Sequence, residues 1–490
     1  MFYVIIGVVL GIIVGAIPGL SGSMLIALAL PLTFYMSSLH AMDLLVAMYV
    51  GSISGGLITA ILLRIPGTPS SIVTTFDGYP MARQGKAGRA LMLGIVSSFI
   101  GGLVSWAILI IAAPPLSRFA LQFGSFEIFS LVLAALVLIA GMGGEGAFFR
   151  SLLAGFIGLF VACPGLDPVT STPRLTFGSV QMTGGFGLLP VLIGMFGISQ
   201  IISDITNIEQ KLEKIPFTFR GMFLSAADMK KSMGNFIRSS LIGTWVGFLP
   251  GIGGNVGSII AYSAAQSSSK NPEEFGSGCD EGIIASETAN NATIGGAFIP
   301  LLTLGIPGSV ITAILMGALI LHDIAPGPLL FKQHPDIVYG IMAVVFVANL
   351  LMFVIMLFAS YGIAKIIDIP KAFMIPAILL FCVIGTFALN NRFFDVWIMF
   401  GFGLFGFLLE KLNMPLGPFI IGLVLSPFAE IHLRSALMAS GGSLLPFVTR
   451  PISLVFVVIS LATLAWTTRK SLLLPYFARR KSLRQNKPAI

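Results

Sequence analysis

The polar residues of one apolar run are the first candidates for chemistry. The stretch EGIIASETANNATIGGAFIPLL, from Glu281, carries Glu287, Asn290 and Asn291 and then continues as an apolar helix. At helical spacing Glu287 and Asn291 share a face, and Asn290 lies beside them. Amides donate and accept hydrogen bonds, and ionisable groups at membrane depth are usually functional. We predict that both amides bind substrate; for Glu287, a place in water beside the membrane is an equal alternative.

Proline–glycine pairs interrupt four other apolar stretches. Proline removes a backbone donor and clashes with the preceding turn, and glycine permits non-helical backbone. A helix that restarts after such a break turns free N–H groups and the positive end of its dipole toward the break. The four pairs are Pro18-Gly19, Pro66-Gly67, Pro250-Gly251 and Pro307-Gly308. They predict an anion site, although any single pair could be a packing kink or a hairpin tip.

The predicted substrate site combines these breaks with the neighbouring hydroxyl, amide and backbone donors. Its residues are Pro18, Gly19, Ser21, Gly22, Ser23, Pro66, Gly67, Thr68, Ser70, Pro250, Gly251, Gly253, Asn255, Asn290, Asn291, Pro307, Gly308 and Ser309. The candidates for binding a coupling ion are Ser52, Ser54, Glu287 and Thr288. Arg64 is the one basic residue expected near a break, so neutral donors must carry most of the anion's charge. Ser360 is expected to face lipid.

The elements that position these residues are membrane helices. The chain has 490 residues, of which 56% are hydrophobic and only 10% are charged. Continuous apolar runs recur along its length, and each is long enough to cross a hydrocarbon core as a helix. They do not alternate polar with apolar residues, which argues against a β-barrel. We predict an all-α polytopic membrane protein with about 10–14 transmembrane segments, some of them broken or re-entrant.

Basic residues indicate the orientation of the chain. Segments 83–89 and 204–238 carry basic residues near helix ends, and the net charge of +8 comes mostly from the tail. Basic flanks are typical of cytoplasmic loops, so we expect a cytoplasmic C-terminus. The first segment lacks the basic start and cleavage site of a signal peptide, and we interpret it as a membrane helix with a periplasmic N-terminus.

Two sequence blocks repeat in the same order. GIIVGAIPGLSGS from Gly11 matches GTWVGFLPGIGGN from Gly243 at an offset of 232 residues. GGLITAILLRIPGTP from Gly55 resembles GAFIPLLTLGIPGSV from Gly296 at an offset of 241. Repetition at matched spacing indicates duplication, and broken helices in matched repeats are typical of transporter binding sites. We predict two inverted repeats, in a first half at 1–203 and a second half, with additional helices, at 236–468. A cytoplasmic linker at 204–235 joins them, and a basic cytoplasmic tail follows at 469–490.

Several other chemistries lack a signal. The three cysteines and four histidines are scattered without metal or disulfide spacing, so no cofactor or resident metal is expected. No nucleotide-binding loop of the type G-x4-G-K-[ST] occurs, which argues against a primary pump. No nucleic-acid partner is expected. A membrane-embedded transferase would need clustered catalytic acids, which the acidic residues at 273–287 do not provide in a known pattern.

The quoted motifs resemble those of a known family. GAIPGLSGSMLIALALPLTF, IPGTPSSIVTTFDGYPMARQGKAG, FLPGIGG, ETANNATIGGAFIPLLTLGIPGS and APGPLLF are similar, in the same order, to the large membrane subunit of the tripartite tricarboxylate transporters. The resemblance runs from about residue 10 to about residue 430. The sequence departs from the family's pattern at Asp323, where glycine is expected.

The resemblance implies a secondary active importer of the bacterial inner membrane. It implies citrate-like or other carboxylate substrates, uptake driven by Na⁺ or H⁺, a small four-helix membrane subunit, and a periplasmic solute-binding protein that delivers the substrate. The residues themselves leave an anion channel or a stand-alone carrier open as alternatives. Accumulation against a gradient would separate a carrier from a channel.

Overall fold

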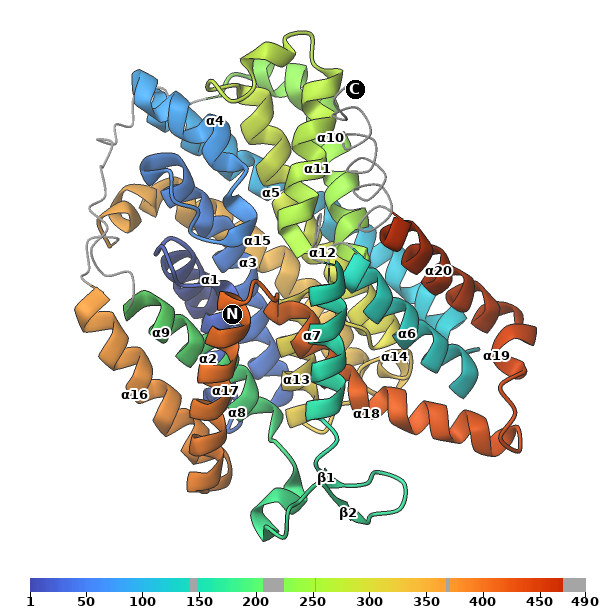
Figure 1. Cartoon of the computed structure of the whole chain (residues 1–490). Helices are drawn as coiled ribbons and strands as arrows, with labels where there is room; N and C mark the ends of the chain where they lie inside the picture. The colour runs from blue at the N-terminus through green and yellow to red at the C-terminus, as the bar shows by residue number, and fades with distance from the viewer. Residues whose placement is uncertain (142–147, 206–223, 252, 367–370, 470–490) are drawn as a thin grey trace, which may run out of the picture. The chain divides into compact units, whose positions relative to one another are not determined.

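The chain folds almost entirely into helices. The structure is a computed structural model that describes residues 1–141, 148–205, 224–251, 253–366 and 371–469 (Figure 1). Within these residues seven helices are long and apolar enough to cross a membrane, and six more apolar helices are shorter, at 10–17 residues. The prediction of an all-α polytopic membrane protein is confirmed. Most of the predicted basic tail and residues 206–223 of the predicted linker lie outside the described residues.

The chain packs into two units, each assembled from segments distant in sequence. The first unit comprises 1–121 and 187–407, and the second comprises 122–186 and 408–490. The predicted boundaries of the repeat halves follow the sequence duplication and stay predictions beside this division. The helices of the first unit are α1 (Phe2–Gly15), α2 (Gly22–Thr33), α3 (Ser38–Leu63), α4 (Thr74–Met81), α5 (Ala87–Ala120), α8 (Leu188–Ile193), α9 (Ser199–Ile205), α10 (Ala226–Phe248), α11 (Gly253–Ser268), α12 (Asp280–Leu304), α13 (Val310–Leu321), α14 (Leu330–Gln333), α15 (Pro335–Ile366), α16 (Lys371–Asn390) and α17 (Phe393–Lys411), whose last turn belongs to the second unit.

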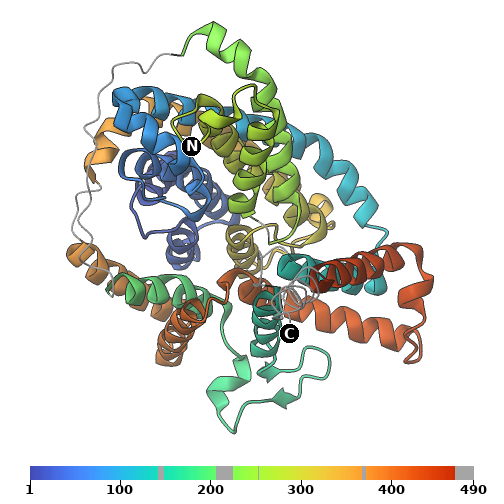
Figure 2. The ribbon, with the colours of Figure 1, turned by 45° about the horizontal axis from the view of Figure 1, so that its top comes forward.

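The second unit is a smaller helical layer with one β-hairpin. Its elements are α6 (Ser125–Gly141), α7 (Phe148–Val161), β1 (Gly165–Leu166), β2 (Pro173–Arg174), α18 (Leu416–Ala439), α19 (Pro446–Thr449) and α20 (Pro451–Thr468). The two strands pair antiparallel (Figure 2). Arg174 of β2 contacts Glu430 of α18 at 2.5 Å, and Arg434 contacts Asp167 at 2.8 Å. Hydrogen bonds from the Thr170 and Val169 N–H groups and from Arg434 hold the pKa of Asp167 below its usual value, so the hairpin is fixed to α18 by charged contacts.

In the first unit, α1 and α2 form a helical hairpin, and so do α10 and α11. Gly7 of α1 lies against Ala47 of α3, and Gly11, further along, lies against Ser52, so α1 and α3 run parallel. The intervening α2 must therefore run back. The pair α10 and α11, side by side in both views, repeats this arrangement next to α12 (Figures 1 and 2). Both hairpin tips contain a predicted break, and Gly19 and Gly251 there adopt φ of +93° and +74°, which is the left-handed backbone that favours glycine.

The second break of each half is a loop that turns back along its own helix. The residues that follow α3 and α12, Arg64 and Gly305, both adopt a left-handed backbone. The loop after α3 returns to the level of Gly56, whose carbonyl accepts from the Gly67 N–H at 3.3 Å. The next helical segment in each half starts with a capping box, at the short 3₁₀ helix η1 (Pro69–Ser71) and at α13. The predicted helix breaks are therefore present at all four Pro-Gly pairs.

The backbone conformation at Asp323, where the sequence departs from the family pattern, explains why glycine is expected there. It follows the C-terminus of α13 and adopts φ +57°, a left-handed conformation in which glycine carries no steric cost. The Ile324 N–H donates to the Leu319 carbonyl at 2.9 Å, which closes the helix end. Aspartate is among the residues that tolerate this region, so the substitution keeps the turn.

Candidate functional site

The two halves repeat individual contacts as well as helices. A side chain at Gly11 would overlap the carbonyl of Met48, and one at Gly243 would overlap that of Ala289. These residues are related by the same offsets, 232 and 241, that relate the sequence blocks. The capping boxes of Thr68 with Ser71 and of Ser309 with Thr312 are another pair, at offset 241. The contacts of Gly67 with Gly15 and of Gly308 with Gly247 are a further pair, at offsets 241 and 232. The duplication therefore extends to individual contacts.

The duplicated helices α3 and α12 cross antiparallel at the centre of the first unit. The Ser54 hydroxyl donates to Asn291 Oδ1 at 2.7 Å, whereas the ring of Tyr49, earlier on α3, lies 6.0 Å from that of Phe298, later on α12. Tyr49 also reaches the Ser309 hydroxyl at 3.4 Å. The equivalent helices of the two halves therefore point in opposite directions.

Contacts at the breaks run crosswise between the halves. The tip of the second hairpin, at Gly254, lies against Ser70 of the first half's loop. The tip of the first hairpin, at Gly22, lies against Ile311 of α13, which follows the second half's loop. Each hairpin tip therefore packs against the segment that follows the second break of the other half.

Several of the predicted backbone donors already have acceptors inside the protein. The Gly251 N–H donates to the Gly308 carbonyl at 2.9 Å, and the Ser309 N–H donates to the Thr312 hydroxyl at 2.8 Å. Free donors remain at the first turns of α2 and α11, because a helix leaves its first N–H groups unpaired. Within the described chain, the N–H groups of Gly22, Ser23 and Gly254 have no acceptor.

The predicted break residues differ in exposure. Gly22, Gly67, Thr68, Ser70, Pro250, Pro307 and Gly308 are buried, Pro18, Gly19, Ser21, Ser23, Pro66, Gly251, Gly253 and Ser309 are half-buried, and Asn255 is exposed. Arg64 is exposed, with its guanidinium over the Tyr79 ring. One expectation about a single residue is wrong: Ser360 is 1% exposed, because α15 turns it inward rather than toward lipid.

Glu287 is fully buried in a network of neutral side chains, not placed in water at the membrane edge. Its carboxylate accepts hydrogen bonds from the Thr74 hydroxyl of α4 and, at 3.4 Å, from the Ser98 hydroxyl of α5. Asn291 donates to Ser98 at 2.8 Å and accepts from Ser54. The amide of Asn291 is therefore occupied by the network that holds Glu287. Sequence analysis missed Thr74 and Ser98, which looked like ordinary hydroxyls in apolar runs.

Asn290 is buried like Asn291, but its amide has a different environment. Its side chain is 0% exposed, and in the described chain no hydrogen bond of standard geometry reaches its amide, which lies near the Glu287 carboxylate. Its Oδ1 lies 2.7 Å from where a side chain at Gly254 would begin, so the amide lies at the first turn of α11. A buried unpaired amide is costly and rare in proteins. The remaining coupling-ion candidates, Ser52 and Thr288, are also buried.

Asp77 of α4 is a second buried carboxylate that the sequence did not single out. It accepts hydrogen bonds from the N–H groups of Gly276, Gly278 and Cys279 at 2.8–3.0 Å and from the Tyr262 hydroxyl at 2.8 Å. It therefore fixes the polar loop between α11 and α12 to the first half. Its signal in the sequence was a lone acid in the apolar run TTFDGYP.

Replacing Tyr262 by phenylalanine should lower the stability of the purified protein by about 1.5–3 kcal/mol, because one hydrogen bond to a buried charge is lost. Asp77→Ala should cost more, since three backbone donors then lose their acceptor. Thermal unfolding in detergent measures both changes. Equal stability of Tyr262→Phe and the unmodified protein would show that the contact contributes nothing.

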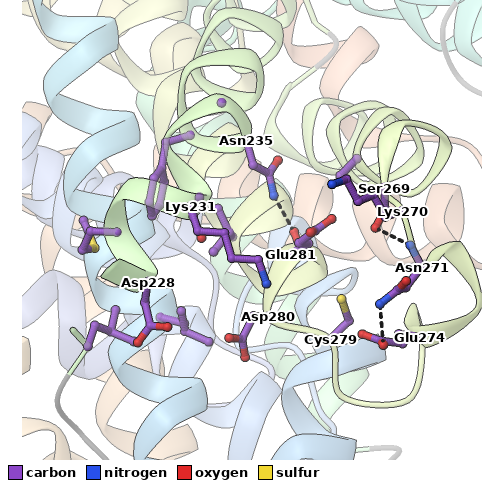
Figure 3. A pocket seen from close by; sticks show the side chains of 18 of the residues that line it. Asp228, Lys231, Asn235, Ser269, Lys270, Asn271, Glu274, Cys279, Asp280 and Glu281 are labelled. Atoms are coloured by element: carbon purple, nitrogen blue, oxygen red, sulfur yellow. Dashed lines mark hydrogen bonds between the residues drawn. The ribbon is translucent and has the colours of Figure 1, made fainter. Parts of the chain in front are cut away.

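A polar cavity of about 790 Å³ lies at the N-terminal end of α12, between α5, α10 and α11 (Figure 3). Its charged lining residues are Lys86, Arg89, Lys231, Arg238, Lys270, Asp228, Glu274, Asp280 and Glu281. Arg89 pairs with Asp280 at 2.6 Å and with Asp228 at 3.7 Å. A hydrogen bond from the Ser225 N–H, together with the positive charge of the nearby Arg89, keeps the pKa of Asp228 below its usual value. This acid therefore stays ionised.

After this pairing, the cavity has more unpaired basic side chains than unpaired acidic ones. Within the described residues, the other four basic side chains of the lining make no ion pair. Lys231 extends into the open space (Figure 3). The unpaired acids are Glu281 and Glu274, and Glu274 accepts from Asn271 at 2.9 Å. The cavity therefore favours a small anion.

Comparisons with known proteins identify the family. Residues 1–421 match the model of the tripartite tricarboxylate transporter TctA family. An uncharacterized 52.8 kDa protein in the TAR-I ttuC' 3' region of Agrobacterium vitis is 38% identical over 457 residues, which cover 93% of this chain and 91% of that protein. An uncharacterized protein in the TAR-II ttuC' 3' region of the same organism is 40% identical over 211 residues, which cover 43% of this chain and 87% of that protein. No solved structure matches. This multi-pass membrane protein, with its duplicated broken helices, belongs to the tripartite tricarboxylate transporter TctA family.

Proposed function

We propose that the chain is the large membrane subunit of a secondary active importer of small carboxylates, and that substrate binds where the first turn of α11 faces Thr68–Ser70. One observation carries this proposal. The Asn290 amide is buried and unpaired between these two elements, beside a free helix N-terminus. Such an amide gains a partner when a carboxylate enters, because its NH₂ group then donates to the anion.

The anion would be held by neutral donors. Arg64 is exposed, and the buried residues near the breaks are hydroxyls, amides and glycines. One helix N-terminus contributes about 0.3–2 kcal/mol, and a hydrogen bond to a charged group about 1.5–3 kcal/mol. Several such contacts must converge to offset the desolvation of a carboxylate. Asn290 with the Gly254 N–H and the hydroxyls of Thr68 and Ser70 is the set that the geometry supports best.

A co-transported cation would supply the remaining compensation, and Glu287 is its best-supported site. The carboxylate is fully buried and takes part in no ion pair among the described residues. A buried carboxylate without a counter-charge is strongly unfavourable, so it favours binding H⁺ or Na⁺. Ser54 is linked to it through Asn291 and Ser98, and Ser52 and Thr288 are further candidates.

We also infer that the two halves are inverted repeats. The antiparallel crossing of α3 with α12 supports this, because a two-fold axis in the membrane plane reverses the direction of equivalent helices. α5 and α15, which follow the two second breaks, cross in the same way: Phe99 contacts Asn349, and Trp106 contacts Met342.

Family membership and the charge pattern support a proposal for the assembly and its location. We propose a place in the bacterial inner membrane with a cytoplasmic C-terminus, a small four-helix membrane subunit as partner, and a periplasmic solute-binding protein that delivers the carboxylate. Full, concentrative uptake by this chain alone would instead favour the stand-alone carrier.

The proposal is tested by replacing Asn290 with alanine. Uptake of carboxylate by proteoliposomes that contain all three proteins should be lost or weakened about tenfold or more, since a hydrogen bond to a charged group is removed. The thermal stability of the purified subunit should be unchanged or higher, because an unpaired buried amide is removed as well.

Asn349→Ala is the matched control. Asn349 is equally buried, but its amide donates to the Phe99 carbonyl at 2.9 Å. Its loss should lower stability by about 1–3 kcal/mol and leave the apparent affinity for substrate unchanged. Unchanged uptake by Asn290→Ala would place the substrate elsewhere.

A further inference from the structure

The floor of the polar cavity is apolar and closed. It is formed by Leu93 of α5, Phe236 of α10 and Ile284 of α12, and all three side chains are buried. Arg89 of α5, Asp228 and Lys231 of α10, and Asp280 and Glu281 of α12 precede these floor residues along the same helices, whereas Arg238 follows Phe236 by two positions. In the structure the layer separates the cavity from the interior of the first unit.

Directly behind the floor lies a layer of three hydroxyls. Ser97, Ser240 and Thr288 each follow one floor residue by four positions on α5, α10 and α12. Residues four apart share a helix face, so each hydroxyl lies one turn behind its floor residue. All three are 0% exposed, and none of their oxygen atoms has a hydrogen-bond partner in the described chain.

The packing of the helices brings the three hydroxyls to one level. Gly243 of α10 packs against Ala289, and Gly101 of α5 packs against Thr288. Ser240 and Ser97 come three and four residues before these glycines, respectively. The hydroxyls therefore line the region where α5, α10 and α12 meet.

Three unpaired hydroxyls in one buried layer need a physical explanation. Buried polar atoms are nearly always hydrogen-bonded, and an apolar side chain of similar size would pack here without this cost. A state in which the layer meets water or a polar solute would satisfy all three. The cavity above, with its excess of cations, is the nearest source of such a solute.

We propose that the cavity is the inner vestibule of the transport path, that Leu93, Phe236 and Ile284 are its closed gate, and that Ser97, Ser240 and Thr288 line the path behind the gate when it opens. The solute is a small carboxylate, attracted by the unpaired cations and able to accept hydrogen bonds from hydroxyls. The identity of the solute rests on the proposed function, whereas the gate rests on packing alone.

The gate is tested by thiol labelling of the full-length protein in proteoliposomes. The background carries Cys163→Ser, Cys279→Ser and Cys382→Ser, because Cys279 lines the cavity. Burial raises the pKa of the Cys279 thiol, so this residue would give a slow, confusing background reaction. Ser240→Cys is the reporter, and a small charged methanethiosulfonate is the probe.

Ser239→Cys is the matched control on the same helix. Ser239 is also 0% exposed, but its hydroxyl donates to Asn235 Oδ1 at 3.1 Å, so it lies one turn behind a polar lining residue and not behind the apolar floor. Phe236→Ala should speed labelling of Ser240→Cys by about tenfold or more and leave Ser239→Cys unchanged, since only the floor above Ser240 is opened. Leu93→Ala is a second floor variant with the same expectation, which keeps the test valid if Phe236→Ala does not fold.

The two proposals fail in distinguishable ways. If the unmodified transporter takes up carboxylate but Ser240→Cys stays as unreactive as Ser239→Cys in both floor variants, the gate is wrong. Equal acceleration at both positions would also overturn it, because it would show general loosening. If the floor variants expose Ser240→Cys selectively but no carboxylate is taken up, the gate stands and the proposed function fails.

Discussion

Replacing Glu287 by glutamine is expected to abolish accumulation of carboxylate against its gradient while leaving exchange of internal for external substrate intact. Glutamine keeps the size of the side chain and can still bond the hydroxyls of Thr74 and Ser98, so the network around Asn291 should survive. It cannot take up and release a cation as the carboxylate does. Net transport requires that step, whereas exchange can proceed with the site permanently neutral.

The measurement compares concentrative uptake with counterflow in the same proteoliposomes, with Na⁺ and H⁺ gradients imposed in turn. Glu281→Gln is the control, because Glu281 lies on the same helix and makes the same change in charge but is only half-buried at the cavity. It should keep both activities. Accumulation by Glu287→Gln at the normal rate would show that the coupling ion binds elsewhere.

The helix breaks could be predicted from the sequence because their signals are local. Proline and glycine act on the backbone of their own and adjacent turns, and at Gly19 and Gly251 the structure adopts the backbone that glycine permits. The duplication was visible because Gly11 and Gly243 face the same close helix approach in each half. Such approaches tolerate no side chain, so glycine recurs at both positions.

The partners of polar side chains could not be predicted in the same way. Ser97 and Ser98 are adjacent and identical in type, yet one hydroxyl has no partner and the other contacts Glu287. Asn290 and Asn291 show the same division. A helix turns adjacent residues about 100° apart, so their environments depend on which helix packs on each face. The sequence singled out both amides but did not show which one is free.

The burial of Ser360 and the contacts between the breaks of the two halves could not be predicted from the sequence either. Ser360 lies in a strongly apolar helix, and hydropathy alone does not distinguish its lipid face from its packed face. The pairing of the Gly254 tip with the Ser70 loop depends on how the two halves interlock. Matched motifs in a duplicated chain predict equivalent roles, but they do not predict that each motif contacts its own counterpart.

The second large effect is expected at a helix crossing. Gly243→Ala should strongly reduce the yield of folded protein, because the new methyl group would overlap the Ala289 carbonyl, which belongs to the backbone of α12 and cannot move aside alone. Overpacking of this kind costs about 1–3 kcal/mol or more. Since α10 carries the hairpin tip that faces the proposed substrate site, any shift of the helix should also reduce transport by the protein that does fold.

Gly234→Ala is the matched control nine residues earlier on α10, where a side chain would meet no atom within 4 Å. There alanine should stabilise the helix by about 0.5–1 kcal/mol, because it has less freedom than glycine to lose on folding. Size-exclusion profiles and thermal unfolding of the two variants measure the contrast. Two variants that behave alike would mean that α10 and α12 are not in close contact at Gly243. Because Gly11 lies at the same position in the first half, Gly11→Ala should repeat the loss, and a loss at only one of the two glycines would argue that the halves do not share this packing.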